Sequence, residues 1–186
     1  MKHEKFSQIS RKYNIIYADP PWNGLGWNTN KNGLNCPARQ YNLMTLDEIK
    51  SLPVKNITAD TCALFLWATM PNLPSAIEVI SAWGFNYATC AFTWVKRNKK
   101  KDGYFFGLGN YTRANAELCL LGTKGKCQKM RQSRKVFSIC DARLTKHSAK
   151  PPEIRDRIVE LFGDLPRIEL FAREQVNKWD CWGAEC

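Results

Sequence analysis

Nearly continuous apolar runs alternate with amphipathic stretches along the chain, and this alternation predicts strands and helices in turn. The runs at 14–19 and 62–68 are typical of strands in a sheet that is covered on both faces. The stretches at 73–83 and 151–162 repeat apolar residues at helical spacing, and each is followed by a glycine that suits a helix end. Further strands are expected at 91–95, at 117–122, around 136–139 and at 167–171. The alternation predicts an α/β fold of three layers, α/β/α, with a mostly parallel sheet.

Two segments that follow the first predicted strand carry more specific signals. Residues 45–48, Thr-Leu-Asp-Glu, form a capping box, in which the threonine and the glutamate each accept a hydrogen bond from the other's backbone N–H. This pattern predicts the start of a short helix. Residues 23–40 are rich in Gly and Asn and form a longer connection than most structural loops, so we expect a binding lid there.

Composition favours one cytoplasmic domain, residues 1–186, with a flexible N-terminus over residues 1–12. The chain has 186 residues, and 44% of them are apolar, which is enough to bury an ordinary core. No apolar run has the length of a membrane span, and the polar N-terminus is not that of a signal peptide. The eight cysteines include no C-x-x-C pair and there are only two histidines, so we expect reduced thiols and no metal site.

The positive charge of the chain is concentrated in two segments. The net charge is +11, from 28 basic and 17 acidic residues. Residues 96–101 hold five basic residues and residues 124–135 hold six, with no acidic residue in either segment, and the rest of the chain is balanced. Two such segments on a neutral body predict loops that bind nucleic-acid phosphates, with Lys96 and Arg97 as candidate substrate contacts. Solvated lysine loops without a partner are the simpler alternative.

Asp19-Pro20-Pro21-Trp22 follows the first predicted strand and is the strongest candidate for a catalytic motif. Two consecutive prolines cannot continue a central strand, because each lacks a backbone N–H and has a fixed φ. Residues that precede a proline are also kept out of the helical region. The chain therefore leaves the sheet in a stiff, extended segment that presents a carboxylate, a carbonyl and an aromatic ring together.

These three groups suit a planar base that carries an amino group. The Asp19 carboxylate and the free carbonyl of Pro20 can each accept one N–H of the amine, which localises the nitrogen lone pair and directs it at an electrophile. Trp22 offers a stacking surface worth roughly 1–3 kcal/mol per base, and the rigid backbone lowers the entropy cost of a reactive geometry. The alternative is a proline turn with an N-capping Asp19 and with Trp22 in the core. In such sheets ligands bind beyond the carboxyl ends of the strands, where both Asp19 and Arg173 fall.

The chain resembles the MT-A70 family of S-adenosylmethionine-dependent adenine-N6 methyltransferases, which includes the catalytic subunit of the eukaryotic mRNA methylation complex and many bacterial and phage enzymes. The blocks that carry the resemblance occur in family order: IIYADPPW (15–22), YNLM (41–44), ALFLWAT (63–69), AWGF (82–85), WVKRN (94–98), AELCLLGTKG (116–125), HSAKPPEI (147–154), IELFARE (168–174) and WDCWGAE (179–185). Together they cover nearly everything after Tyr13. The resemblance implies a Rossmann-like methyltransferase fold with a permuted order, in which the catalytic motif precedes the cofactor strand.

By position, the resemblance also implies S-adenosyl-L-methionine as the cofactor and gives roles to individual residues. The implied catalytic motif is Asp19, Pro20, Pro21 and Trp22, with Asp19 also near the cofactor. Tyr41 would help to enclose the target base. Lys150 would contact the methionine portion of the cofactor or gate the pocket, Arg173 would contact the cofactor, and Glu185 would bind its ribose. Without the family pattern, Lys150 reads equally well as a solvated lysine, Arg173 as a surface ion pair and Tyr41 as a packing aromatic.

The reaction implied by the resemblance is direct methyl transfer to adenine N6, with DNA favoured over RNA because a compact chain is similar to the prokaryotic and phage members. A homodimer, or a heterodimer with a related subunit, is the assembly that the family suggests. The alternatives are an RNA adenine-N6 methyltransferase, a non-catalytic nucleic-acid-binding subunit, and an enzyme that methylates a protein amide. The intact motif argues against the second, and its leading Asp against the third. Two positions depart from the family pattern: Lys178 stands where glycine is usual and Ala184 where asparagine is usual.

Overall fold

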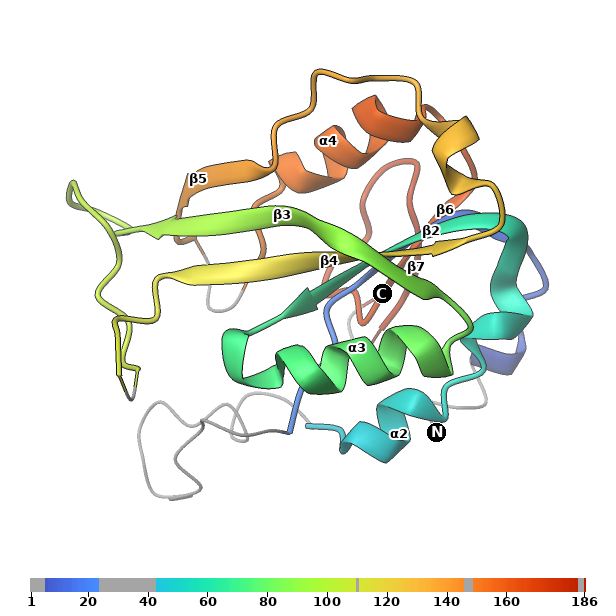
Figure 1. The fold of residues 1–186 in the computed structure, drawn as a ribbon, viewed down its shortest axis with the longest axis horizontal. Helices are drawn as coiled ribbons and strands as arrows, with labels where there is room; N and C mark the ends of the chain where they lie inside the picture. Colours follow the sequence, from blue (N-terminus) through green and yellow to red (C-terminus); the bar gives the residue numbers. More distant parts are fainter. Residues whose placement is uncertain (1–5, 24–42, 110, 146–148, 184–185) are drawn as a thin grey trace.

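The computed structural model describes residues 6–23, 43–109, 111–145, 149–183 and 186, and a single β-sheet forms its centre (Figure 1). The strands are β1 (Tyr13–Ala18), β2 (Thr58–Ala68), β3 (Asn86–Arg97), β4 (Ala116–Lys124), β5 (Ile139–Arg143), β6 (Arg167–Leu170) and β7 (Asp180–Trp182). The α-helices are α2 (Leu46–Lys50), α3 (Leu73–Ala82) and α4 (Glu153–Phe162). Three short 3₁₀ helices connect them: η2 (Val54–Ile57), η3 (Met70–Asn72) and η4 (Cys127–Met130).

The sheet is mixed, and β4 is the strand that makes it so. Within the described residues its seven strands lie in the order β5-β3-β4-β2-β1-β6-β7. β1 is parallel to both of its neighbours, β2 and β6, and two more parallel pairs join β6 to β7 and β3 to β5. β4 is antiparallel to β2 and to β3, so it runs against the other strands of the sheet. The predicted α/β class is confirmed. We call the edge at which β1, β2, β3 and β6 end the carboxyl edge, and the opposite edge the amino edge.

Helices cover both faces of the sheet. Figure 1 shows α4 on one side of the sheet and α2 and α3 on the other. Successive residues of a strand point to opposite faces, and β1 shows this clearly. Ile16 and Ala18 pack in the apolar cluster that includes α3, whereas Ile15 and Tyr17 pack in the cluster that includes α4. Because both faces of β1 are buried, its sequence from Ile15 to Ala18 shows no alternation of apolar and polar residues.

The ends of the helices follow local sequence signals. The Thr45 hydroxyl accepts the Glu48 N–H at 3.2 Å, and the Glu48 carboxylate accepts the Thr45 N–H at 2.7 Å, so the predicted capping box is confirmed. Gly84 follows α3 with φ +84°, and Gly163 follows α4 with φ +85°. Glycine adopts this left-handed conformation at little cost and therefore suits the end of a helix.

The sequence misplaced the start of three strands by three or more residues and did not predict a fourth strand. β2 begins at Thr58, four residues before the predicted run at 62–68. β3 begins at Asn86, well before residue 91, and its first residues pair with β4. The sequence did not predict this part of the strand because these residues are exposed and carry no apolar signal. The strand expected around 136–139 is wrong in position, since β5 starts only at Ile139. The residues before β5 turn toward α4, where the Arg157 guanidinium donates to the carbonyl of Phe137 at 3.0 Å. β7 has three residues, too few to give a periodic signal, and the sequence did not predict it.

The N-terminal residues that the structure describes join the core. Phe6 is buried, and its ring meets Trp182 edge-on with 4.9 Å between the ring centroids. Arg11 pairs with Asp180 at 3.1 Å. The expectation of a flexible N-terminus over residues 1–12 did not anticipate these contacts, and residues 1–5 lie outside the described part.

Three features of the described residues bear on other classes of site. No helix in that part of the chain is long and apolar enough to span a bilayer. No three His, Cys, Asp or Glu side chains lie close enough there to bind a metal ion together. The seven described cysteines are free thiols.

Candidate active site

The Asp19-Pro20-Pro21-Trp22 segment leaves the sheet at the carboxyl edge and is anchored immediately. β1 lies between β2 and β6, so Asp19 emerges from the middle of the parallel strands. The prolines cannot donate hydrogen bonds, and the segment is held through its carbonyls and through the residue that follows. The Met44 N–H donates to the Pro21 carbonyl at 2.9 Å, and the Asn23 N–H donates to the Met44 carbonyl at 3.0 Å. This pair of bonds makes a short parallel bridge beside the motif.

We expected the carbonyl of Pro20 to be free, but in the structure it already accepts a hydrogen bond. It accepts the Trp22 N–H at 2.9 Å, which closes a tight turn within the motif. A carbonyl oxygen has two lone pairs, so one remains for a second donor. The indole of Trp22 is fixed as well, because its Nε1–H donates to the Trp67 carbonyl at 3.1 Å. Trp22 is half-buried. Two acceptors and an aromatic surface are thus presented by one rigid turn.

Four charged side chains form a continuous network beside the motif, and we call it the charge network. The Lys150 ammonium lies 2.7 Å from an Asp19 carboxylate oxygen and 3.1 Å from a Glu117 oxygen. The other Glu117 oxygen lies 2.7 Å from the Lys96 ammonium. The network therefore runs Asp19–Lys150–Glu117–Lys96 and contains two charges of each sign. Glu117 and Lys150 expose less than a tenth of their side chains, whereas Asp19 exposes 20%. Among Asp19, Lys150 and Glu117, Asp19 is thus the residue that solvent or substrate reaches most easily.

The pKa values of the two carboxyls in the charge network are shifted in opposite directions. Burial raises the pKa of Asp19, Lys150 opposes this rise and Glu117 adds to it, so the pKa of Asp19 lies above its ordinary value. Burial also acts to raise the pKa of Glu117, but Lys150 and Lys96 outweigh it and lower that pKa to about 2. The physical reason for the difference is that Glu117 binds two ammonium groups and Asp19 only one. Burial lowers the pKa of Lys150, but the two carboxylates outweigh it and keep the pKa above its usual value.

Two tryptophan rings pack against the two ammonium groups of the charge network. The Lys150 ammonium lies 5.5 Å from the centroid of the Trp67 ring, and the Lys96 ammonium lies 5.0 Å from that of Trp94. The two indoles meet edge-on, 6.5 Å apart. The Trp67 Nε1–H donates to the hydroxyl of Tyr17 at 2.7 Å, which fixes the ring from the β1 side. Cations over aromatic faces gain about 2 kcal/mol or more when they are desolvated, so the tryptophans help to keep both ammonium groups in place.

The structure brings most of the described candidate residues to the carboxyl edge. Lys150 contacts Asp19 directly, and Arg173 follows β6 and lies near enough to Asp19 for its charge to oppose the rise of the Asp19 pKa that burial causes. Lys96 and Arg97 are the last residues of β3 and not loop residues, which corrects the predicted start of the first basic loop. Arg97 binds Asp141 of β5 through two bonds of 2.6 and 2.7 Å. A contact of either cation with phosphate stays a prediction.

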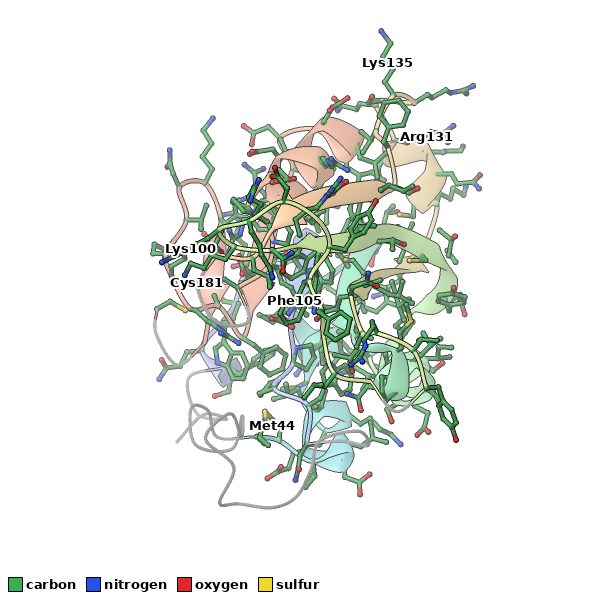
Figure 2. The ribbon with its side chains drawn as sticks, turned by 90° about the vertical axis from the view of Figure 1, so that its left-hand side faces the viewer. Met44, Lys100, Phe105, Arg131, Lys135 and Cys181 are labelled. Atoms are coloured by element: carbon green, nitrogen blue, oxygen red, sulfur yellow. The ribbon has the colours of Figure 1, made fainter. Side chains whose placement is uncertain are left out.

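The two basic segments lie at opposite edges of the sheet. Residues 96–101 begin at the carboxyl edge. Residues 124–135 begin where β4 ends, and β4 runs the other way, so its last residue pairs with Cys62 near the start of the apolar part of β2. The nine residues of β4 span roughly 30 Å. In Figure 2, Lys100 and Phe105 are at mid-height, whereas Arg131 and Lys135 lie at the top of the molecule. Only the first segment adjoins Asp19.

Some candidate residues lie outside the described part of the chain, and one member of the site was missed. Tyr41, Glu185 and all but the first residue of the expected lid at 23–40 are not described. Glu117 was not singled out from the sequence, although an acidic residue at the start of an otherwise apolar strand was a usable signal. A charge in such a position is rarely buried unless it is paired. Here it is paired twice.

One of the two departures from the family pattern has a visible backbone consequence. Lys178 has φ +63°, in the left-handed region that glycine adopts without strain. The family's usual glycine suits this conformation, and the lysine keeps it. Ala184 lies outside the described residues.

Comparisons with known proteins agree with this geometry. The MT-A70 family model matches residues 13–185. The chain is 36% identical over 197 residues to the type II methyltransferase M.MunI of Mycoplasma sp, an alignment that covers 98% of this chain and 82% of that protein. It is 30% identical over 167 residues to the human N(6)-adenosine-methyltransferase catalytic subunit METTL3, with 89% of this chain and 26% of that protein covered. The human N(6)-adenine-specific methyltransferase METTL4 is 25% identical over 197 residues, with 94% and 38% covered. The chain thus spans most of the Mycoplasma protein but only about a quarter of METTL3.

Proposed function

The chain belongs to the MT-A70 family, and from this membership we propose that it methylates the N6 amine of adenine in DNA with S-adenosyl-L-methionine as the methyl donor. The observation that carries the proposal is the position of Asp19. Its partly exposed carboxylate leaves the middle of the sheet in the same rigid turn as the Pro20 carbonyl and the Trp22 ring. We assign the fold to the Rossmann-like methyltransferases with a permuted motif order, because the catalytic motif follows β1 and the proposed cofactor residue Arg173 follows the neighbouring β6.

In the proposed mechanism the turn binds the target amine. Asp19 uses one oxygen for Lys150, and an ionised carboxylate has enough lone pairs to accept an N–H from the adenine as well. The second lone pair of the Pro20 carbonyl accepts the other N–H. Together they turn the lone pair of N6 toward the methyl group. Because the turn is already fixed by Met44 and Trp67, little entropy is lost when the base is positioned.

Lys150 and Arg173 are the described residues that would hold the donor. Both are cations near Asp19, and the methionine portion of the donor carries a carboxylate, so the charge of this donor set fits the group. When bound, S-adenosyl-L-methionine supplies an electrophilic methyl group, and the sulfur keeps the electron pair of the broken C–S bond. Asp19 is then placed to take the proton that N6 loses, since burial makes this carboxylate a stronger base than an exposed one. Glu185 and Tyr41 complete the proposed contacts.

We favour DNA over RNA as the substrate because of the extent of the alignments. The type II methyltransferase of Mycoplasma is matched along most of its length, whereas METTL3 contains much that this chain does not match. A target base in a duplex must be flipped out, at a cost of a few kcal/mol. Unpaired DNA avoids this cost. A cytoplasmic location and a dimeric assembly remain part of the proposal.

The test is methyl transfer from labelled S-adenosyl-L-methionine to single-stranded DNA, duplex DNA and RNA, followed by analysis for N6-methyladenine. We expect labelling of DNA by the wild type and at least a hundredfold lower rate for Asp19→Ala, which loses the electrostatic positioning of the amine. Asp60→Ala is the matched control, because Asp60 is an exposed carboxylate near the start of β2. Activity that survives Asp19→Ala would exclude the mechanism. Labelling of RNA alone would favour the RNA enzyme, and binding of nucleic acid without any labelling would favour a non-catalytic subunit.

A further inference from the structure

The segment between β3 and β4 carries an unusual concentration of exposed apolar side chains. Tyr104, Phe106, Leu108 and Tyr111 lie within eight residues of each other and expose 55%, 66%, 89% and 101% of their surface. Side chains of this size normally contribute to a core. We call residues 98–109 and 111–113 the arm. Figure 1 shows the chain that links β3 to β4 extending beyond the sheet at the carboxyl edge.

The arm is braced by its own backbone and by β5. The Ala114 N–H donates to the Gly107 carbonyl at 3.2 Å, and a Cβ at Gly107 would lie 2.2 Å from the Ala114 carbonyl oxygen, so the two sides of the arm touch. Arg143 of β5 binds Asp102 at 2.8 Å and donates to the Lys101 carbonyl at 3.1 Å. The exposed rings are therefore displayed on a preformed support, and a partner that binds them loses little free energy to ordering.

The base of the arm is tied to the candidate active site. Both sides of the arm close on Lys96, whose backbone N–H donates to the Asn115 carbonyl at 2.8 Å and whose carbonyl accepts the Phe105 N–H at 2.8 Å. The side chain of the same Lys96 binds Glu117 in the charge network. Lys96 therefore links the exposed rings directly to the charge network that holds Asp19.

The charge of the arm indicates which partner its rings suit. Residues 96–113 contain six basic residues and one acidic residue, Asp102. Two of the arginines already lie over exposed rings: the Arg97 guanidinium is 4.5 Å from the Tyr104 centroid, and the Arg113 guanidinium is 3.7 Å from that of Phe106. Cations interleaved with exposed aromatic faces match a polymer of phosphates and planar bases. An apolar protein surface would offer no partner to the lysines at residues 99–101.

We propose that the arm is a stacking platform that binds unpaired bases of the substrate strand next to the target adenine. The proposal rests on the proposed function for the identity of the strand. In it, Phe106 and Tyr111 stack on bases, and the lysines of residues 99–101 bind the phosphates between them. The arm would hold the flanking nucleotides of a flipped or single-stranded target while Asp19 binds the target itself.

The experiment compares binding of two short fluorescent strands of equal length, an oligothymidylate and an abasic sugar-phosphate strand, in the absence of the methyl donor. We expect the wild type to bind the oligothymidylate roughly tenfold or more tightly than the abasic strand, since stacking contributes per base. Phe106→Ala combined with Tyr111→Ala should remove this preference and leave abasic binding unchanged, whereas Phe106→Trp with Tyr111→Trp should retain it. Tyr111→Ala alone should reduce the preference with no risk to folding, because this side chain is fully exposed.

Phe137→Ala is the matched control, since Phe137 is an exposed ring outside the arm whose exposure lies between those of Phe106 and Tyr111. A base preference that survives loss of both arm aromatics would overturn the proposal, as would a dimer that becomes a monomer in Tyr111→Ala with the preference unchanged, which would assign the arm to contacts between copies of the chain. The outcome is separable from the proposed activity. A protein that binds bases through the arm but transfers no methyl group contradicts the function alone, and an active enzyme without base preference contradicts the arm alone.

Discussion

The two basic segments of this chain are nearly equal in charge and entirely different in setting. Residues 96–101 begin in β3 at the carboxyl edge, and their first two cations bind Glu117 and Asp141. Residues 124–135 begin at the amino edge, and in the described part of the chain none of their six cations forms an ion pair with an acidic residue. The first segment begins beside Asp19 in the charge network, whereas the second lies away from it. The difference teaches that charge density alone does not locate a binding site, and that the direction of β4 decides which segment reaches Asp19.

The largest expected effect comes from removing the acidic partner of the first segment. Glu117→Gln leaves Lys96 and Lys150 buried with one carboxylate fewer, and we expect the free energy of unfolding to fall by about 3–5 kcal/mol. Urea unfolding followed by circular dichroism measures it. Glu160→Gln is the control under the second segment, where the Glu160 carboxylate accepts only the Ser133 hydroxyl at an exposed position. We expect a change of about 0.5 kcal/mol or less there. Equal losses would mean that the two settings do not differ energetically.

The pH dependence of unfolding should show the same contrast. The pKa of Glu117 is lowered from 4.5 to about 2, so its ionised form stabilises the fold above pH 4.5, and that stability is lost as the pH falls toward 2. The contribution is about 3 kcal/mol. Unfolding free energies measured between pH 5 and about 2.5 should fall less steeply in Glu117→Gln than in the wild type. Glu160→Gln should follow the wild type. Parallel curves for all three proteins would contradict the lowered pKa of Glu117.

Neutralising exposed lysines tests the comparison in function. Lys99, Lys100 and Lys101 changed together to Gln should lower kcat/KM for DNA methylation roughly tenfold and reduce the salt dependence of binding by about two to three phosphate contacts. The matched variant changes Lys126, Lys129 and Arg131 to Gln, three exposed cations of the second segment. It should reduce non-specific binding with little change in kcat/KM. If both triple variants lose activity equally, the second segment also contacts substrate during catalysis.

The smallest expected effect concerns a cation outside both segments. Lys178 lies in the left-handed region, and its charge adds to the hydrogen bond and charge of Arg167, which are the main causes of the lowered pKa of Asp164. Lys178→Gly should raise the free energy of unfolding by about 1 kcal/mol by relieving backbone strain. Lys178→Gln removes the same charge and keeps the strain, so its stability should match the wild type. Thermal unfolding of the three proteins separates backbone geometry from charge, and a stabilised Gln variant would show that the charge was the cause.

Local patterns predicted much of the fold, and long-range pairing limited the rest. The apolar runs of β1 and β2 and the capping box at Thr45 are read within a few residues, because their cause is local. The start of β5 was misplaced because Arg157, far along the chain, holds the preceding residues against α4. The reversed direction of β4 has no local signal at all. The placement of the two basic segments therefore could not be derived from their sequences.

The candidate site likewise contains residues that local sequence patterns predicted and features that depend on distant parts of the chain. Asp19 and Trp22 were found because two adjacent prolines constrain the backbone whatever the tertiary context. Lys150 and Arg173 were found through the family pattern. Glu117 was missed, since its importance lies in two partners that are distant from it in sequence. The occupied carbonyl of Pro20 was missed because a turn that forms inside the motif depends on where Trp22 is held by Trp67.

The bridge between the Asp19-Pro20-Pro21-Trp22 motif and Met44 has a consequence for how the protein could change over evolution. Asn23 and Met44 are hydrogen-bonded neighbours, so the chain between them leaves and returns at one fixed point next to Trp22. Doubling the length of a closed loop costs only about 0.6 kcal/mol. We therefore expect the connection between these two anchors to tolerate changes in length, provided that Tyr41 is kept, without a shift of Asp19. The position of Asp19 would then stay fixed while the sequence beside it diverges among related proteins.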